Sequence, residues 1–124
     1  MVVNRRLGGK YMNVGDYVRY ISVYNNEIKI RKIIEIIPPD NLIEENYYKF
    51  NNYEGTIEKD IIKSSPNIID LIEVGDYVNG YEVTSKDQFL GFGNHDWYMT
   101  NDEIKSIVTK EQFESMEYRI ESQE

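Results

Sequence analysis

"VGDYV" occurs at residues 14–18 of this 124-residue chain and again at residues 74–78. The match continues beyond the five letters, because Val23 stands at the same distance from the first copy as Val83 from the second. Glycine tolerates a positive φ, and aspartate accepts hydrogen bonds from nearby backbone N–H groups, so Gly-Asp is typical of a turn. Each copy is therefore predicted to be a turn followed directly by a β-strand.

The tripeptide "IKS" forms a second repeat, at 62–64 and at 104–106. Each copy precedes a helix-start pattern, namely Ser65 as a helix N-cap before Pro66, and Thr109 with Gln112 as a capping box. Two repeats that follow one another in the same order indicate an internal duplication.

The residues after each "VGDYV" predict a β-hairpin. In the second copy Asn79-Gly80 stands between β-forming residues, which favours a two-residue type I′ turn. In the first copy the hairpin is predicted to be longer, with Asn25-Asn26 at its turn. Alternation at period two predicts one common face for Ile28, Ile30, Ile34 and Ile36, with Lys32 interrupting it. Pro38-Pro39 ends this strand, because proline donates no hydrogen bond to a β-ladder.

Further short strands complete each unit, in "NYYKF" and "EGTIEKDII" of the first and in "DQFLGF" and "DWYMT" of the second. We expect a mostly β fold with minor α structure, built from two related small SH3-like β-barrel or meander units, each followed by a short helix. The predicted boundaries are a flexible segment at 1–11, β units at 12–71 and 72–120, and a tail at 121–124. "EYRI" near the end of the second unit is a candidate final strand.

Composition favours a folded cytoplasmic protein. Hydrophobic residues make up 40% of the chain, which is sufficient for a packed interior. The sequence has no cysteine, which excludes disulfides and thiolate chemistry. It also has no apolar run of the roughly 20 residues that span a bilayer, and no secretory signal core at the N-terminus.

Charge is unevenly distributed along the chain. Residues 1–33 carry seven basic and two acidic side chains, a net charge of +5, whereas residues 34–124 carry seven basic and twenty acidic side chains, a net charge of −13. The total of −8 opposes long-range attraction to nucleic acid. A basic N-terminal face beside an acidic remainder nevertheless keeps two hypotheses open. Either the basic residues contact the phosphates of a nucleic acid, or the acidic residues imitate a phosphate backbone.

No pattern in the sequence predicts catalysis, a metal site or a cofactor. His95 is the single histidine, and with Asp96 it supplies fewer ligands than zinc requires. Asp16 and Asp76 are carboxylates at equivalent places in the two copies of the repeat, and the turn chemistry of the repeat explains both. The protein is therefore expected not to be an enzyme.

Two sets of side chains are candidates for binding a partner protein, and a third set is the candidate for the alternative function, nucleic-acid binding. The acidic set imitates a phosphate backbone and comprises Glu44, Glu45, Glu54, Glu58, Asp60, Asp102 and Glu103. Eleven tyrosines are more than so small a core holds, and exposed tyrosines favour interfaces; this aromatic set comprises Tyr47, Tyr48, Tyr53 and Tyr98. The alternative is phosphate contact with tyrosines stacked on bases, through Arg5, Arg6, Lys10, Arg19, Lys29, Arg31 and Lys32.

The runs "SPNIIDLIEVGDYVNG" and "IKSIVTKEQFESMEY" resemble a group of small, uncharacterised proteins from phages and prophages of Clostridium-like and other Firmicutes bacteria. The resemblance covers roughly residues 12–120 and implies a phage accessory protein, without assigning roles to single residues. Such proteins often bind and disable a host component. The leading hypothesis is a non-catalytic inhibitor of a host defence nucleoprotein, most concretely an anti-CRISPR protein that blocks a Cas effector. The alternatives are a nucleic-acid-binding phage regulator and a minor virion or assembly component.

Overall fold

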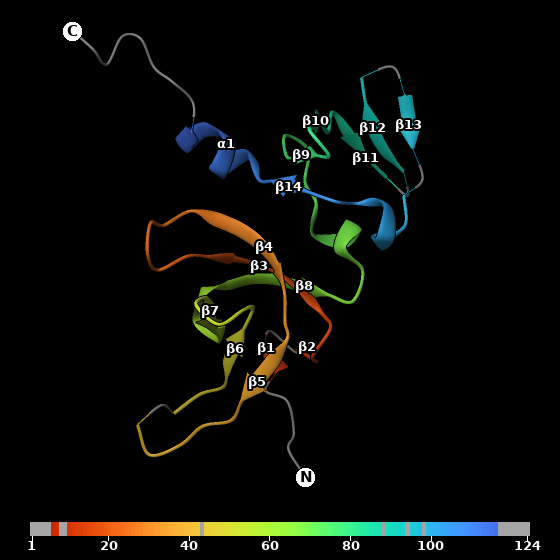
Figure 1. Ribbon diagram of the computed structural model, residues 1–124. Coiled ribbons are helices and arrows are strands. Elements are labelled where there is room, and N and C mark those ends of the chain that lie inside the picture. Colours follow the sequence, from red (N-terminus) through yellow and green to blue (C-terminus); the bar gives the residue numbers. More distant parts are fainter. Residues whose placement is uncertain are drawn as a thin grey trace, which may run out of the picture. The chain divides into compact units, whose positions relative to one another are not determined.

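A computed structural model describes residues 6–7, 10–42, 44–87, 89–93, 95–97 and 99–116 (Figure 1). The fold is mostly β, with 36% strand and 16% helical structure, as the sequence predicts. Its strands form small antiparallel sheets, and none of the described sheets closes into a barrel. The chain divides after Ile72 into two compact units, which are described separately.

The first unit contains three sheets. Its three-stranded sheets have the orders β4-β3-β8 and β5-β6-β7, and a short β1-β2 pair precedes them. The strands are β1 Arg6–Leu7, β2 Lys10–Tyr11, β3 Tyr17–Ile21, β4 Ile28–Lys32, β5 Glu35–Ile37, β6 Tyr47–Lys49, β7 Gly55–Ile57 and β8 Ile61–Ser65. Two 3₁₀ turns, η1 Glu58–Asp60 and η2 Ile68–Leu71, stand before and after β8.

The second unit repeats this order of elements. Its sheets have the orders β10-β9-β14 and β11-β12-β13, so β9 takes the place of β3 and β14 that of β8. The elements are β9 Tyr77–Val78, β10 Tyr81–Glu82, β11 Ser85–Lys86, β12 Leu90–Phe92, β13 His95–Trp97, η3 Asn101–Glu103, β14 Ile107–Val108 and α1 Lys110–Met116. The 3₁₀ turn again precedes the last strand, and a helix again follows it. "EYRI" lies outside the described residues.

The two "VGD" turns make the same hydrogen bonds. Gly15 N–H donates to the Ile33 carbonyl and Ile33 N–H to the Asp16 carbonyl, both at 2.8 Å. In the second unit Gly75, Val83 and Asp76 make the same two bonds at the same distances. Both glycines have a strongly positive φ, at +97° and +99°, which explains why glycine is required there.

These bonds correct one equivalence expected from the sequence. Val83 corresponds to Ile33 rather than to Val23, because each closes the same pair of bonds with its turn. Ile33 and Val83 are fully buried, whereas Val23 is 67% exposed. Fifteen residues separate Tyr17 from Ile33, but only five separate Tyr77 from Val83, so the first hairpin is ten residues longer.

Both predicted hairpins are present. Asn79 and Gly80 have φ of 52° and 88°, and they join Val78 to its partner Tyr81, which agrees with a type I′ turn. Strands β3 and β4 pair over five residues each, and the loop between them contains Asn25-Asn26, with Asn26 at φ 60°.

Three local expectations are wrong. The copies of "IKS" are one residue out of structural register, because Ser64 pairs with Val18 but Ile107, not Ser106, pairs with Val78. A bulge in the β3–β8 pairing accompanies this shift.

The N-cap expected at Ser65 is the second error. Ser65 is the last residue of β8, and η2 has Asn67 at its N-cap position. The Ser65 hydroxyl instead accepts from Asn67 N–H at 3.0 Å and donates to Asp70 at 2.6 Å. By contrast, the capping box of Thr109 and Gln112 is confirmed by both of its hydrogen bonds.

The single isoleucine face is the third error. Strand β4 ends at Lys32 and β5 begins at Glu35, so the chain changes sheets between them. Ile34 consequently lies on the surface, 51% exposed, whereas Ile33 is fully buried in the core cluster.

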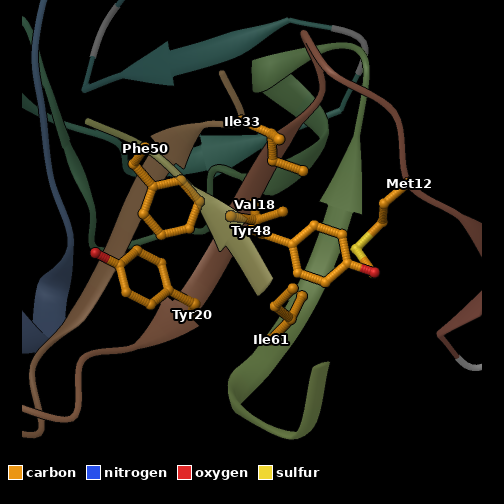
Figure 2. Close-up of a cluster of buried hydrophobic side chains, with 7 residues drawn as sticks. All are labelled: Met12, Val18, Tyr20, Ile33, Tyr48, Phe50 and Ile61. Atoms are coloured by element: carbon orange, nitrogen blue, oxygen red, sulfur yellow. The ribbon is translucent and has the colours of Figure 1, made fainter. Parts of the chain in front are cut away.

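A cluster of seven buried side chains forms the core of the first unit. Figure 2 shows Met12, Val18, Tyr20, Ile33, Tyr48, Phe50 and Ile61 gathered from several strands. The rings of Tyr20 and Phe50 lie 4.7 Å apart, tilted by 38°. Each large side chain buried in this way stabilises the fold by about 1.5–3 kcal/mol.

In each unit a helical segment packs against the strand that follows the "VGD" turn. In the first unit, Arg19 projects from β3 with 1% exposure and donates to the Leu71 carbonyl in η2 at 3.0 Å. In the second, Phe113 of α1 stacks on Tyr77 of β9, with ring centroids 4.4 Å apart. The helical segment that follows the last strand of each unit thus contacts the strand that follows the "VGD" turn.

Candidate interaction surface

The longer hairpin of the first unit carries an exposed apolar tip. Val23 and Tyr24 are 67% and 76% exposed in the loop between β3 and β4. The loop is hydrogen-bonded rather than open, because Ser22 N–H donates to the Glu27 carbonyl and Asn26 N–H to the Ser22 carbonyl, both at 2.8 Å. A tip held in this way loses little conformational freedom when a partner binds it.

Glu54, in the turn between β6 and β7, contacts both strands of this hairpin. Its carboxylate accepts a short hydrogen bond from the Tyr20 hydroxyl. It also pairs with Lys29 at 3.2 Å and with Arg31 at 3.3 Å, both on β4. The Glu54 side chain is only 14% exposed, so these contacts are partly shielded from solvent.

The pKa directions follow from this arrangement. Burial by itself raises the pKa of Glu54, but the hydrogen bond from Tyr20 and the charges of Lys29 and Arg31 outweigh it, and the pKa is held below its ordinary value. Burial, followed by Glu54, raises the pKa of Tyr20 well above that of a free phenol. The group therefore stays an ionised carboxylate with a neutral tyrosine at neutral pH.

The predicted aromatic set divides into buried and exposed members. Tyr53 is 88% exposed, in the turn that also carries Glu54, and Tyr47 is half-buried. The Tyr47 ring crosses Gly55 so closely that a Cβ there would lie 2.6 Å from the ring, which requires glycine. The surface role expected of Tyr48 is wrong, because its side chain is fully buried in the core. Tyr98 lies outside the described residues.

The predicted acidic set is mostly at the surface. Glu44, Asp102 and Glu103 are exposed, and Glu45, Glu58 and Asp60 are half-buried. The exception is Glu54, which is partly buried and contacts two cations and Tyr20 within the unit, so its expected role as an external contact stays a prediction.

Four of these acids lie at equivalent places in the two units. Glu58 and Asp60 belong to η1, and Asp102 and Glu103 belong to η3, which precede the last strands of the two units. Two of the four also have structural contacts. Glu58 accepts from the Tyr48 hydroxyl at 3.3 Å, and Glu103 accepts from Thr100 N–H at 2.8 Å.

The basic set is largely engaged within the protein. Arg19 is buried, which contradicts its expected contact with phosphate. Lys29 and Arg31 pair with Glu54, so their charges are partly neutralised. Lys32 is exposed and lies 5.9 Å from the centre of the Tyr17 ring. Arg5 and the side chains of Arg6 and Lys10 lie outside the description.

Of the four residues that were weighed for catalysis, the structure describes the side chains of two. Asp16 and Asp76 perform the predicted turn role, accepting from Asn13 N–H at 2.9 Å and from Glu73 N–H at 2.8 Å. His95 and Asp96 lie in β13, and their side chains are outside the description. Among the described residues no group of three or more His, Cys, Asp or Glu side chains is arranged to hold a metal ion. In that same part of the chain no helix is long and apolar enough to cross a membrane.

Comparison with protein-family models gives no matching family, and comparisons with curated proteins and with solved structures give no match either. The surface must therefore be interpreted from its own residues. Sequence reasoning did not find the Glu54 contacts, although alternation in β4 places Lys29 and Arg31 on one face.

Proposed function

We propose that this protein is a non-catalytic binding protein built from two SH3-like units, which occludes a basic, nucleic-acid-binding surface of a host defence nucleoprotein. Its most concrete form is a phage-encoded inhibitor of a Cas effector. The observation that carries the proposal is the repeated acidic 3₁₀ turn, Glu58–Asp60 in one unit and Asn101–Glu103 in the other.

The order of elements supports the SH3-like description of each unit. A hairpin leads into a three-stranded meander, a 3₁₀ turn follows, and the last strand returns to pair with the first. In SH3-like folds this order produces a small, partly open barrel whose loops gather at its ends. Binding functions are commonly located on such loops because the strands hold them in place.

Charge at the surface of each unit supports acidic contacts with a partner. The turn residues Asp60 and Asp102 present carboxylates next to the last strand of their respective units. Of the basic side chains expected to bind phosphate, Arg19 is buried and two others are paired with Glu54. The net charge of −8 favours encounter with a basic groove and opposes encounter with nucleic acid.

The hairpin tip supplies the apolar part of the proposed surface. Tyr24 offers a large ring with few rotatable bonds, and the hydrogen-bonded loop holds it outward. Acidic side chains would set orientation and the rate of encounter, whereas Tyr24 and Tyr53 would contribute contact area.

The proposal is tested by adding the purified protein to purified RNA-guided nucleases of several types and measuring their binding to target DNA. We expect one effector to lose DNA binding at a stoichiometric ratio. Asp60→Lys with Asp102→Lys should weaken this inhibition by more than tenfold, since each acidic turn then presents a positive charge to a basic surface. The matched control is Glu82→Lys with Glu114→Lys, which gives the same net charge at exposed sites outside the turns.

Two results would overturn the proposal. Full inhibition by the Asp60→Lys, Asp102→Lys protein would show that the acidic turns do not contact the effector. Salt-sensitive binding of the protein to DNA or RNA alone, without inhibition of any effector, would favour the nucleic-acid-binding regulator instead.

A further inference from the structure

Asn79 lies at the point where three segments of the second unit meet. Its side chain carbonyl accepts from Lys105 N–H at 2.7 Å and from Ser106 N–H at 3.1 Å, and its amide nitrogen donates to the Glu103 carbonyl at 2.9 Å. Its backbone N–H donates to the Ser106 carbonyl at 2.9 Å. We call these four bonds the Asn79 clasp, because they tie the end of η3 and the two residues before β14 to the β9–β10 turn.

The residue that follows Asn79 is Gly80, and no other asparagine in the sequence precedes a glycine. Gly80 is exposed at the tip of the turn, and a Cβ added to it would meet no atom within 4 Å beyond its chain neighbours. A glycine offers the least hindered backbone nitrogen of any residue to an asparagine side chain that precedes it.

We propose that Asn79-Gly80 is a site of spontaneous deamidation, that the clasp retards the reaction in the folded protein, and that the product opens the clasp. The Gly80 backbone nitrogen attacks Cγ of Asn79 and forms a cyclic imide. The bond between Cγ and Nδ2 breaks, and ammonia leaves with the proton from the Gly80 nitrogen. Water then adds to either carbonyl of the imide and opens it to aspartate or isoaspartate.

The clasp retards this reaction because all three side-chain hydrogen bonds fix the position of the carboxamide. Attack by the Gly80 nitrogen requires the side chain to leave Glu103, Lys105 and Ser106. Opening three hydrogen bonds makes the reactive arrangement rarer, so we expect deamidation to be roughly a hundredfold slower in the folded protein than in the unfolded chain.

The product opens the clasp because it has no donor for Glu103. In aspartate a carboxylate oxygen replaces the amide nitrogen, and it would face the Glu103 carbonyl oxygen, an acceptor, across the former 2.9 Å contact. Isoaspartate also lengthens the main chain within a two-residue turn, which disturbs the pairing of Val78 with Tyr81. Either product loosens the segment that carries the acidic turn η3, although the deamidation itself does not depend on the proposed function.

The first experiment incubates the full-length protein at mildly alkaline pH, with and without denaturant, and maps modified peptides by mass spectrometry. We expect the mass gain of deamidation at Asn79, as aspartate and isoaspartate, with the slow rate in buffer and the fast rate in denaturant. Asn67 is an internal control, because it falls on the same tryptic peptide and precedes isoleucine. Equal rates in the two conditions, or modification of Asn67 as fast as of Asn79, would overturn the proposal.

The second experiment compares Asn79→Asp with Asn26→Asp by hydrogen exchange. Both asparagines have a positive φ in a hairpin loop, so the two variants share the change in charge and backbone setting. We expect Asn79→Asp to reduce amide protection at Lys105 and Ser106 by tenfold or more, with no change there in Asn26→Asp. Unchanged protection in Asn79→Asp would contradict the opening of the clasp, and the incubation of the natural sequence remains decisive if that variant does not fold.

Discussion

The two units have the same scaffold and differ in what completes it. Both contain the "VGD" turn with its paired bonds to Ile33 or Val83, and both order their strands alike. The first has ten more residues in its hairpin, whereas the second follows its last strand with an α-helix rather than a 3₁₀ turn. The repeated letters thus define the common scaffold, and the individual features lie in the residues that are not repeated.

Each unit uses its own addition to cover apolar surface. The extension of the first hairpin places Tyr20 against Phe50 in the core. In the second unit the chain has already turned at this position, at Gly80, and α1 contributes Phe113 to stack on Tyr77 on the other face of the sheet. Duplicated scaffolds can therefore be stabilised by different local insertions, because burial of apolar area is not directional.

The largest expected effect is that of removing the Tyr20 ring. Tyr20→Ala should destabilise the first unit by about 3–5 kcal/mol, because it leaves a cavity beside Phe50 and removes the donor to Glu54. Urea unfolding followed by hydrogen exchange of each unit would measure the change. Tyr53→Ala is the matched control, since a side chain that is 88% exposed should change stability by no more than about 0.5 kcal/mol. Similar losses for both would contradict the role of the extension in the core.

The next effect distinguishes the repeated aspartates. Asp76 is fully buried and accepts from Glu73 N–H at 2.8 Å and from Lys110 N–H, the first residue of α1, at 2.9 Å. Asp76→Ala leaves both donors without this acceptor and should cost about 2–4 kcal/mol, whereas Asp16→Ala should cost about 1–2 kcal/mol. Urea unfolding followed by hydrogen exchange of each unit would measure both losses, since Asp16 lies in the first unit and Asp76 in the second. A larger loss from Asp16→Ala would reverse the comparison.

The two turn glycines should behave alike. Alanine at Gly15 or at Gly75 must adopt a φ near +98°, and each substitution should cost about 1–2 kcal/mol. An added Cβ at Gly75 would lie 3.3 Å from Lys110 Cδ, which is part of a flexible side chain, so the extra cost there is small. Equilibrium unfolding of both variants should therefore give losses within about 0.5 kcal/mol of each other. Unequal losses would show that the turns are not energetically equivalent.

Sequence patterns predicted the features that depend on neighbouring residues. The Asn79-Gly80 turn and the Thr109 capping box are local chemistry, and both are confirmed. Burial of Tyr48 and Arg19 was not predicted, because it depends on which sheet face η2 and the core cover. The sequence comparison also matched Val83 with the wrong residue of the first unit. Only hydrogen bonds between distant residues show that Ile33, and not Val23, is its structural equivalent.

The same limit applied to the candidate surface. Exposure of Tyr53, Glu44 and Asp102 agrees with the acidic and aromatic sets, but composition could not separate Glu54 from them. Glu54 is 25 residues from Lys29 in sequence, and only the folded meander brings the two together. Charge patterns thus predict which residue types reach the surface, whereas pairing within the unit depends on tertiary structure.

The smallest expected effect is that of replacing Glu54, which joins the hairpin to the turn between β6 and β7 in the first unit. Glu54→Gln should cost about 1 kcal/mol at neutral pH, because it removes the charge that pairs with Lys29 and Arg31. The folded-state pKa of Glu54 is lowered, since its hydrogen bond and nearby cations outweigh the effect of burial. Its stabilisation is therefore complete above the pKa of an unfolded glutamate and is lost as the pH falls through the lowered folded-state value. The difference in unfolding free energy between the natural protein and Glu54→Gln should shrink over that acidic window, and a constant difference would show that Glu54 stabilises the hairpin by packing rather than by charge.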